Sequence, residues 1–234
     1  MYTFDTTVSY SRLDKNGIVP YYEIMNYLQD CSTFQSEYLG AGVEHMKKEN
    51  KAWMVLAYKL RLHKTLRLGD EICVGTSASN FDRVMANRQY FIKDKEGNYL
   101  VKAETIWALI ELDKRMPVRI QEEDIKMYPT EPIFENMKVS RKVKLSGERK
   151  RLPEFKVLRS YIDGNGHMNN ANYLRAAEEY LPEKKAYGEI EIVYNKEALE
   201  GETIIPYLYQ EENGLGIRFE SEVGDLHTLI KLTL

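Results

Sequence analysis

The sequence predicts an α+β fold made of two similar halves. In the first half a strand-like segment precedes a long amphipathic helix, and several strand-like segments follow it; the second half repeats the order of helix and strands. Strands that follow one another without intervening helices favour antiparallel pairing, whereas a parallel sheet needs strands and helices in alternation. Short motifs that recur in the same order in the two halves are the second reason for this prediction.

The first half begins with residues 2–10, which alternate as in a strand, and Pro20 then opens a helix. Apolar side chains recur there at steps of three and four residues from Ile24 to Tyr38, and Gly40 and Gly42 end the pattern. Four strand-like segments follow, at 53–62, 71–78, 84–93 and 99–112. A hairpin turn at 94–98 joins the last two.

A linker is predicted near the middle of the chain, where Pro117, Pro129 and Pro132 surround an acidic stretch. We therefore expect an N-terminal domain of residues 1–128 and a C-terminal domain of residues 129–234. In the second half a helix is expected at 169–181, before Pro182. The predicted strands after it are 189–194, 203–210, 216–222 and 226–232.

Composition excludes several classes of protein. The 234 residues carry 33 Lys and Arg against 36 Asp and Glu, a net charge of −3, which argues against a nucleic-acid binder. The longest apolar run, residues 52–58, is far shorter than the roughly 20 residues of a membrane span, so no membrane insertion is expected. The N-terminus lacks a secretion signal, and two cysteines make no disulfide framework, which together predict a reduced, cytoplasmic location.

The repeat is visible in individual residues. Asp14-Lys-Asn16-Gly-Ile18 aligns with Asp163-Gly-Asn165-Gly-His167, and each motif directly precedes its helix. Further along, Gly-Asp-Glu-Ile at 69–72 aligns with Gly-Glu-Thr-Ile at 201–204, at a smaller offset because the first half has a longer stretch between its helix and this strand. Because both matches have the same structural position, we interpret the chain as a tandem duplication.

The two copies differ at the residues best suited to chemistry. Ile18 occupies the position of His167, and Thr65 occupies that of Glu197, whereas the Asp and Asn of the motif occur in both copies. A histidine gains and loses a proton near neutral pH, and a carboxylate can act as a base for water. N–H groups at a helix start can also polarise a carbonyl. This combination indicates hydrolysis of an ester or thioester in the second half.

Each of these residues also has a structural explanation. A histidine near a helix start is often structural, Asp163 and Asn165 are good turn formers, and Glu197 lies among other charged residues. The basic stretch 138–151, with seven Lys or Arg and one Glu, is of a kind that is more often a solvated surface than a docking patch. No phosphate-binding, dinucleotide-binding or serine nucleophile-elbow motif is present.

The chain resembles the acyl-acyl carrier protein (acyl-ACP) thioesterases, in the form of a bacterial member. Residues 163–173, Asp-Gly-Asn-Gly-His-Met-Asn-Asn-x-x-Tyr, are similar to the family's Asp-x-Asn-x-His-Val-Asn-Asn-x-x-Tyr. Asn-Tyr-Leu-Gln-Asp at 26–30 is similar to its first-helix motif, and Trp107 with Asp-Lys-Arg-Met-Pro at 113–117 is similar to the end of its first domain. These motifs occur in the family's order over almost the full length.

The resemblance implies two hot-dog domains, each an antiparallel sheet wrapped around a central helix. It implies hydrolysis of the thioester between a fatty acyl chain and the carrier protein's phosphopantetheine arm, with no cofactor or metal of the enzyme's own. The site residues carried over are Asp163, which holds the loop, Asn165 and His167, which polarise the carbonyl, and Glu197, the base for water. Where the plant pattern has a cysteine after this glutamate, Ala198 stands here, so a covalent acyl-cysteine at this position is excluded.

The substrate's other contacts are expected from the same resemblance. An acyl tunnel in the first domain would be closed by residues such as Met25, Phe34 and Trp53. Arg149, Lys150 and Arg151 would face the carrier protein, which is typically acidic. Single hot-dog domains pair through their sheets, and the tandem arrangement can meet that need within one chain or leave a homodimer; the sequence leaves both open.

Other functions remain alternatives at the level of sequence. An acyl-CoA thioesterase would use the same residues with a different thioester, and a non-catalytic acyl-binding module would keep the cavity without needing a base. A hot-dog dehydratase needs a different arrangement of histidine and acid.

Overall fold

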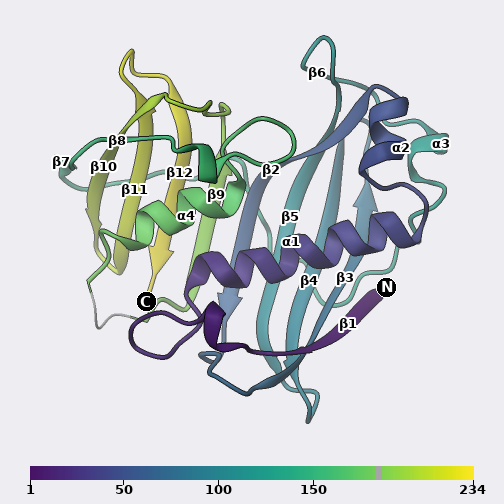
Figure 1. Ribbon diagram of the computed structural model, residues 1–234, viewed down its shortest axis with the longest axis horizontal. Helices are drawn as coiled ribbons and strands as arrows, with labels where there is room; N and C mark the ends of the chain where they lie inside the picture. Colours follow the sequence, from purple (N-terminus) through teal and green to yellow (C-terminus); the bar gives the residue numbers. More distant parts are fainter. Residues whose placement is uncertain (183–185) are drawn as a thin grey trace. The chain divides into compact units, whose positions relative to one another are not determined.

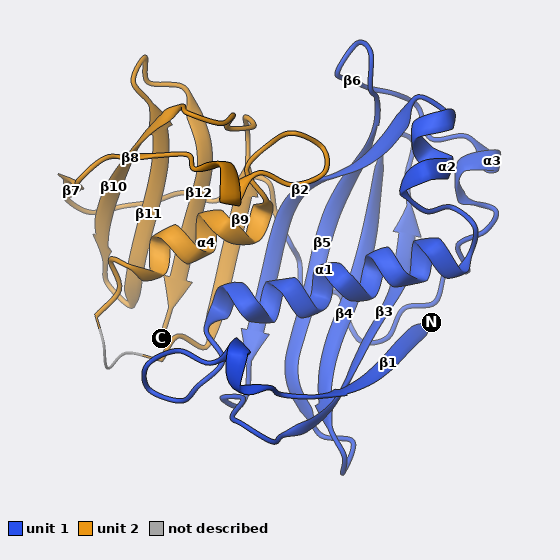
Figure 2. Ribbon diagram, viewed as in Figure 1, with its two compact units in different colours: residues 1–139 blue, residues 140–234 orange. Residues whose placement is uncertain are grey.

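The computed structural model describes residues 1–182 and 186–234. The chain forms two compact units, unit 1 at Met1–Val139 and unit 2 at Ser140–Leu234 (Figure 2). Among the helices of the described residues, none is long and apolar enough to cross a membrane.

Unit 1 is an antiparallel sheet with the strand order β1-β3-β4-β5-β2, and the long helix α1 lies across it (Figure 1). Its elements in chain order are β1 (Tyr2–Thr7), the short 3-10 helix η1 (Tyr10–Arg12), α1 (Tyr21–Tyr38), α2 (Val43–Lys48), β2 (Lys51–Leu62), β3 (Glu71–Phe81), β4 (Met85–Asp94), β5 (Tyr99–Glu111), β6 (Met116–Pro117) and α3 (Glu122–Ile125). The α+β class and the order of helix and strands expected for a hot-dog domain are confirmed.

Helix α1 forms where the apolar residues recur at helical spacing. Pro20 is its N-cap residue, and Gly40, at φ +74°, follows its end in a conformation that favours glycine. The buried side chains along it, spaced so that they share one face, are Ile24, Met25, Tyr27, Leu28, Cys31, Ser32 and Gln35. The Cys31 thiol reaches the carbonyl of Val74 on β3 at 3.6 Å, so this face of the helix packs on the sheet.

Unit 2 repeats the arrangement with a shorter helix. Its antiparallel strands have the order β9-β12-β11-β10-β7, and α4 lies across them (Figure 1). Its elements are β7 (Arg149–Arg151), β8 (Phe155–Lys156), the 3-10 helix η2 (Arg159–Tyr161), α4 (Asn170–Glu178), β9 (Glu189–Tyr194), β10 (Thr203–Glu211), β11 (Gly214–Ser221) and β12 (Leu226–Thr233). The helix ends before residue 181, the end predicted from the sequence.

The segment of residues 130–137, called here the cover segment, belongs to unit 1. The N–H groups of Ile133 and Phe134 donate to Gln89 Oε1 on β4, at 2.8 and 3.2 Å. The Met137 N–H donates to Glu104 Oε2 on β5 at 2.7 Å. The compact units therefore divide after Val139; the functional boundary between residues 128 and 129 stays a prediction.

The backbone hydrogen bonds reproduce the alignment of the two halves found in the sequence. In unit 1 the Gly69 N–H donates to the Val8 carbonyl at 3.0 Å, and in unit 2 the Gly201 N–H donates to the Val157 carbonyl at 2.9 Å. Val8 and Val157 lie the same number of positions ahead of the two aligned turn motifs, and each glycine opens its copy of the second motif. The two units thus share a frame down to single hydrogen bonds, as a tandem duplication requires.

Candidate active site

The motif at residues 163–167 forms a tight turn ahead of α4. The Asp163 N–H donates to the His167 carbonyl at 2.9 Å, and the Gly166 N–H donates back to the Asp163 carbonyl at 3.1 Å. Asp163 Oδ1 accepts the Asn165 N–H at 2.8 Å, which closes the turn with a side chain. Gly166 has φ +85°, where a side chain would be strained. Asp163 therefore organises the loop, while Asn165 lies exposed at its tip.

His167 and Glu197 meet at this turn. Their Nε2 and Oε2 atoms lie 3.0 Å apart, although the residues are far apart in the sequence, and their side chains are 20% and 27% exposed. Backbone pairing explains the meeting, because the Met168 N–H donates to the Ala198 carbonyl at 2.9 Å. His167 and Glu197 directly precede these two hydrogen-bonded residues, so their side chains are brought side by side. The pair is held by the protein and still open to a substrate.

Tyr173 supports the segment that carries Glu197. The Ala198 N–H donates to its hydroxyl oxygen at 3.1 Å, and the ring is only 2% exposed in the interior of unit 2. Burial raises the pKa of Tyr173, so the hydroxyl keeps its proton. The sequence indicated Tyr173 only as the last residue of the motif at 163–173 and gave it no role at the site. The alignment of the two turn motifs, continued into the helices, pairs it with Ile24, and that replacement is a signal that could have marked it.

The start of α4 offers less to a substrate carbonyl than the sequence suggested. Asn169 is the N-cap residue, as expected, and its Oδ1 accepts the Ala171 N–H at 2.9 Å. The N–H groups of Met168, Asn169 and Asn172 donate to carbonyls of the protein, those of Ala198, Tyr161 and Asn169. These donors are already used within the fold. The helix start therefore has fewer free N–H groups for a substrate carbonyl than the sequence suggested.

The residues expected along the acyl tunnel do not share one surface. Met25 is buried at 2% exposure on α1, whereas Phe34 is 45% exposed and packs edge-on against Phe4 of β1. Trp53 on β2 lies near Phe81, with ring centroids 6.4 Å apart. Met25 is the one that lies in the interior of unit 1. Their role in acyl binding stays a prediction.

The three residues expected to face the carrier protein form strand β7 and are all exposed. Arg149 donates to Glu220 Oε2 at 2.7 Å, and its guanidinium lies 3.5 Å from the centroid of the Tyr207 ring. Arg151 donates to Glu154 Oε2 at 2.7 Å. Two of the three charges are thus paired within unit 2, and docking of a carrier protein here stays a prediction.

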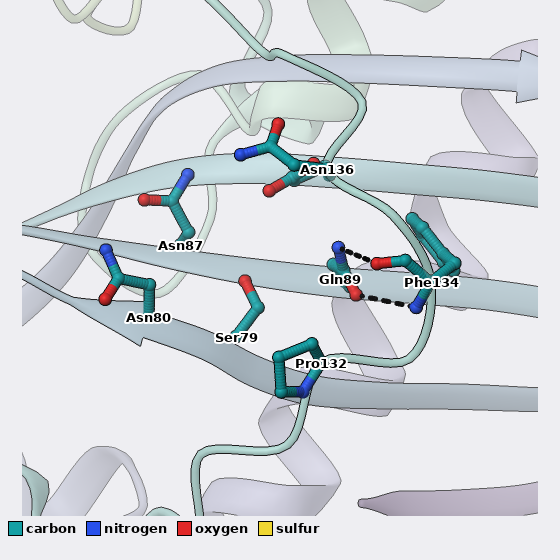
Figure 3. Close-up of a pocket in the computed structure, with 8 residues that line it drawn as sticks. Ser79, Asn80, Asn87, Gln89, Pro132, Phe134 and Asn136 are labelled. Carbon is teal, nitrogen blue, oxygen red and sulfur yellow. Dashed lines mark hydrogen bonds between the residues drawn. The ribbon is translucent and has the colours of Figure 1, made fainter.

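A polar cavity of about 140 Å³ lies in unit 1 beneath the cover segment (Figure 3). The residues that line it are Ser79, Asn80, Asn87, Gln89, Glu104, Pro132, Phe134 and Asn136. Five of these eight residues carry an amide or a carboxylate group, and Pro132 and Phe134 of the cover segment add apolar surface. In the described parts of the chain, no group of three His, Cys, Asp or Glu side chains is placed to hold a metal ion.

Comparison with known families identifies the class of this protein. Residues 1–128 match the model of the acyl-ACP thioesterase N-terminal domain, and residues 145–231 match that of the C-terminal domain. The chain belongs to the acyl-ACP thioesterase family. It is therefore an acyl-ACP thioesterase, a thioester hydrolase, which confirms the function expected from the resemblance.

Solved structures agree with this thioesterase fold. An acyl-ACP thioesterase from Bacteroides thetaiotaomicron superposes with a TM-score of 0.87 at 20% identity, covering 99% of this chain and 96% of the other. The 12:0-ACP thioesterase from Umbellularia californica does so with a TM-score of 0.87 at 14% identity and the same coverage. A hypothetical protein from Aquifex aeolicus matches 55% of this thioesterase over its own full length, at a TM-score of 0.51 and 18% identity. A search of curated proteins returns no match.

Proposed function

We propose that this thioesterase hydrolyses its substrate at the turn of unit 2, with Asp163, Asn165, His167 and Glu197 as the site residues. The observation that carries the proposal is the contact of 3.0 Å between His167 Nε2 and Glu197 Oε2, made by two side chains that remain partly exposed. In unit 1 the same frame holds Ile18 and Thr65, which have no acid or base to offer.

The proposed reaction is a direct attack by water. Glu197 takes a proton from a water molecule, and the water oxygen forms a bond to the thioester carbonyl carbon. Asn165 and His167 stabilise the negative charge on the carbonyl oxygen while Asp163 keeps the loop in shape. When the tetrahedral intermediate collapses, the carbon–sulfur bond breaks and the proton passes through the His167–Glu197 pair to the sulfur. The products are a free fatty acid and the carrier protein with a free phosphopantetheine thiol.

We extend the proposal to the partners of the reaction. The acyl chain enters unit 1 near α1, and Arg149, Lys150 and Arg151 face the acidic carrier protein. Lys150 is exposed at the middle of β7. In the part of the chain that the structure describes, Arg149 and Arg151 each contact a carboxylate, and Lys150 does not. Release of the fatty acid ends chain elongation, and we propose a cytoplasmic location for the enzyme. Sedimentation would show whether the enzyme forms a homodimer. The proposed chemistry is the same in a monomer and in a homodimer.

The test is release of free fatty acid from acyl-ACP substrates of about eight to about eighteen carbons, with the matching CoA esters alongside. We expect faster release from the carrier-bound series, with a maximum at one chain length that reports the depth of the tunnel. Neutralising Lys150 as Lys150→Gln should raise KM for acyl-ACP and leave the rate with acyl-CoA unchanged. Equal loss with both substrates would contradict docking at β7, and faster release from CoA esters would contradict the preference for the carrier protein.

A further inference from the structure

A second histidine lies buried behind the Glu197 segment. His227 on β12 has no exposed surface and occupies an irregularity in the sheet. Thr228 pairs with Phe219 and Leu226 pairs with Glu220, so His227 is the extra residue of a β-bulge. A bulge turns a side chain in a direction that regular pairing would not allow, and bulges are frequent beside active sites.

The contacts of His227 converge on the residue before Glu197. Its Nδ1 lies 3.1 Å from the Lys196 carbonyl oxygen, and because a carbonyl only accepts, Nδ1 carries the proton of this bond. The His227 carbonyl in turn accepts the Asn195 N–H at 2.8 Å and the Lys196 N–H at 3.3 Å. Lys196 is therefore held by both the backbone and the ring of His227.

Glu202 extends this support to the other side of Glu197. Its Oε2 accepts the Leu199 N–H at 3.0 Å. Its Oε1 lies 3.2 Å from His227 Nε2, which is ion-pair distance without the alignment of a well-formed hydrogen bond. The two side chains thus fix residues 196 and 199, and Glu197 lies between these fixed points.

Unit 1 shows that the bulge itself does not require a histidine. There Ile92 pairs with Val101 and Lys93 with Tyr99, which leaves Leu100 as the extra residue of the equivalent bulge. The Leu100 carbonyl accepts the N–H groups of the equivalent pair of residues, His63 at 2.8 Å and Lys64 at 3.4 Å. Leu100 is 4% exposed. The bulge residue is thus a leucine in unit 1, where the neighbouring segment carries Thr65, and a histidine in unit 2, where the neighbouring segment carries Glu197.

We infer that His227 is a positioning residue that holds the Lys196 carbonyl so that the Glu197 carboxylate meets His167. The inference rests on the proposed role of Glu197. Because His227 is fully buried, it acts through the geometry of this segment and not by contact with substrate. A displacement of about 1 Å at a catalytic group costs on the order of a hundredfold in rate.

The first test replaces the histidine by the residue of the silent unit. His227→Leu is expected to fold and to lower kcat about 10- to 100-fold with little change in KM, because binding contacts are untouched. His227→Asn, whose amide can donate to the Lys196 carbonyl as Nδ1 does, should restore most of the rate. Ile230→Val, equally buried on the same strand, is the matched control and should keep kcat while lowering the melting temperature slightly.

A double-mutant cycle separates positioning from general damage. In a Glu197→Gln background, His227→Leu should cause no further loss, because a residue that acts through Glu197 has nothing left to position. An equal loss in both backgrounds, or a wild-type kcat in His227→Leu, would overturn the inference while the proposed function stands. Wild-type turnover in Glu197→Gln alone would overturn the proposed function, and the inference with it. If the leucine variant does not fold, His227→Gln, whose longer amide extends toward Glu202, should be slower than His227→Asn.

Discussion

The turns ahead of α1 and α4 have the same backbone and different chemistry. In unit 1 the Asp14 N–H donates to the Ile18 carbonyl at 2.8 Å, and Asp14 Oδ1 accepts the Asn16 N–H at 2.8 Å. The corresponding distances from Asp163 in unit 2 are 2.9 and 2.8 Å. Since Asp and Asn form this turn in a copy that lacks a histidine, they are needed for its shape. The comparison shows that the shape of the turn does not depend on the histidine.

Four of the differences between the units lie at or beside one carboxylate. Given as unit 2 and then unit 1, they are His167 and Ile18, Tyr173 and Ile24, Glu197 and Thr65, and His227 and Leu100. In unit 2, the three that accompany Glu197 touch its side chain or the backbone beside it. A duplicated frame has thus acquired, or retained, its chemistry in one copy through a small connected set of side chains.

The largest effect is expected when unit 2 is given the residues of unit 1 at the reacting positions. His167→Ile and Glu197→Thr should each lower kcat for acyl-ACP at least about a hundredfold, because each removes an acid or base from the reaction. Circular dichroism and thermal melting should show a folded protein, since unit 1 tolerates both residues in the same frame. Either variant retaining more than a tenth of the wild-type turnover would contradict the proposed roles.

The two turn aspartates should separate stability from activity. Asp14→Ala and Asp163→Ala each remove a side-chain acceptor of a turn N–H and should cost about 1 kcal/mol of unfolding free energy. Only Asp163→Ala should also lower kcat, by roughly tenfold or more, because it displaces Asn165 and His167. Denaturant unfolding and steady-state kinetics measured on the same preparations check this. A similar loss of kcat in Asp14→Ala would show that the turn of unit 1 also serves the reaction.

Removal of the Tyr173 hydroxyl tests a single hydrogen bond that supports the segment carrying Glu197. Tyr173→Phe leaves the Ala198 N–H without its acceptor in the interior and should lower kcat about fivefold, with a loss of about 1 kcal/mol of stability. Tyr180→Phe is the matched control: its hydroxyl donates to the Pro153 carbonyl at 3.0 Å, away from the Glu197 segment, so it should leave kcat unchanged. Equal kinetics in the two variants would remove Tyr173 from the set that supports Glu197.

Most of the sheet and both long helices could be predicted from local patterns. The strand at Glu189–Tyr194 has the predicted ends, and α1 lies where the apolar period and Gly40 placed it. The first strand ends at Thr7 instead of continuing to residue 10, because a 3-10 turn begins at Tyr10. Helices α2 and α3, with six and four residues, are too short for a helical period to be recognised.

The support of the site was harder to foresee than its reacting residues. His167 and Glu197 emerged because the two aligned motifs set them against Ile18 and Thr65. The correspondence of His227 with Leu100 is marked by no sequence motif, and only the two bulges reveal it. The cover segment likewise binds its sheet through long-range contacts without any local pattern. Comparing the sequences of the two copies thus identifies the candidate reacting residues, whereas the residues that support them are identified only from the hydrogen bonds of the structure.

The smallest predicted effect concerns a carboxylate of each sheet whose surroundings differ. Glu104 of unit 1 is 1% exposed, and burial raises its pKa despite hydrogen bonds from the Met137 N–H and Gln89. For Glu211 of unit 2, burial acts in the same direction, but the Ser146 amide and hydroxyl and the Lys231 ammonium outweigh it and lower the pKa. Lys231 Nζ lies 3.3 Å from this carboxylate, whereas the hydrogen bonds to Glu104 come from neutral groups.

Opposite shifts predict opposite responses to pH. Glu104 binds its proton more tightly in the folded state, so its contribution to stability is full in acid and is lost as the pH rises through the raised pKa. Glu104→Gln should therefore raise the melting temperature at pH 7 and change it little near pH 4. Glu211 contributes above its unfolded pKa and loses this as the pH falls through the lowered pKa, so Glu211→Gln should cost about 1 kcal/mol at pH 7 and little in acid.

Thermal unfolding at the two pH values checks both signs, with Glu212→Gln at an exposed neighbouring position as the control. Destabilisation of equal size by Glu104→Gln and Glu211→Gln at pH 7 would show that the neutral hydrogen bonds in unit 1 stabilise a charged carboxylate as well as a lysine does in unit 2. A gain for the first and a loss for the second would show that the two sheets satisfy their buried acids by different means, although their backbones share one frame.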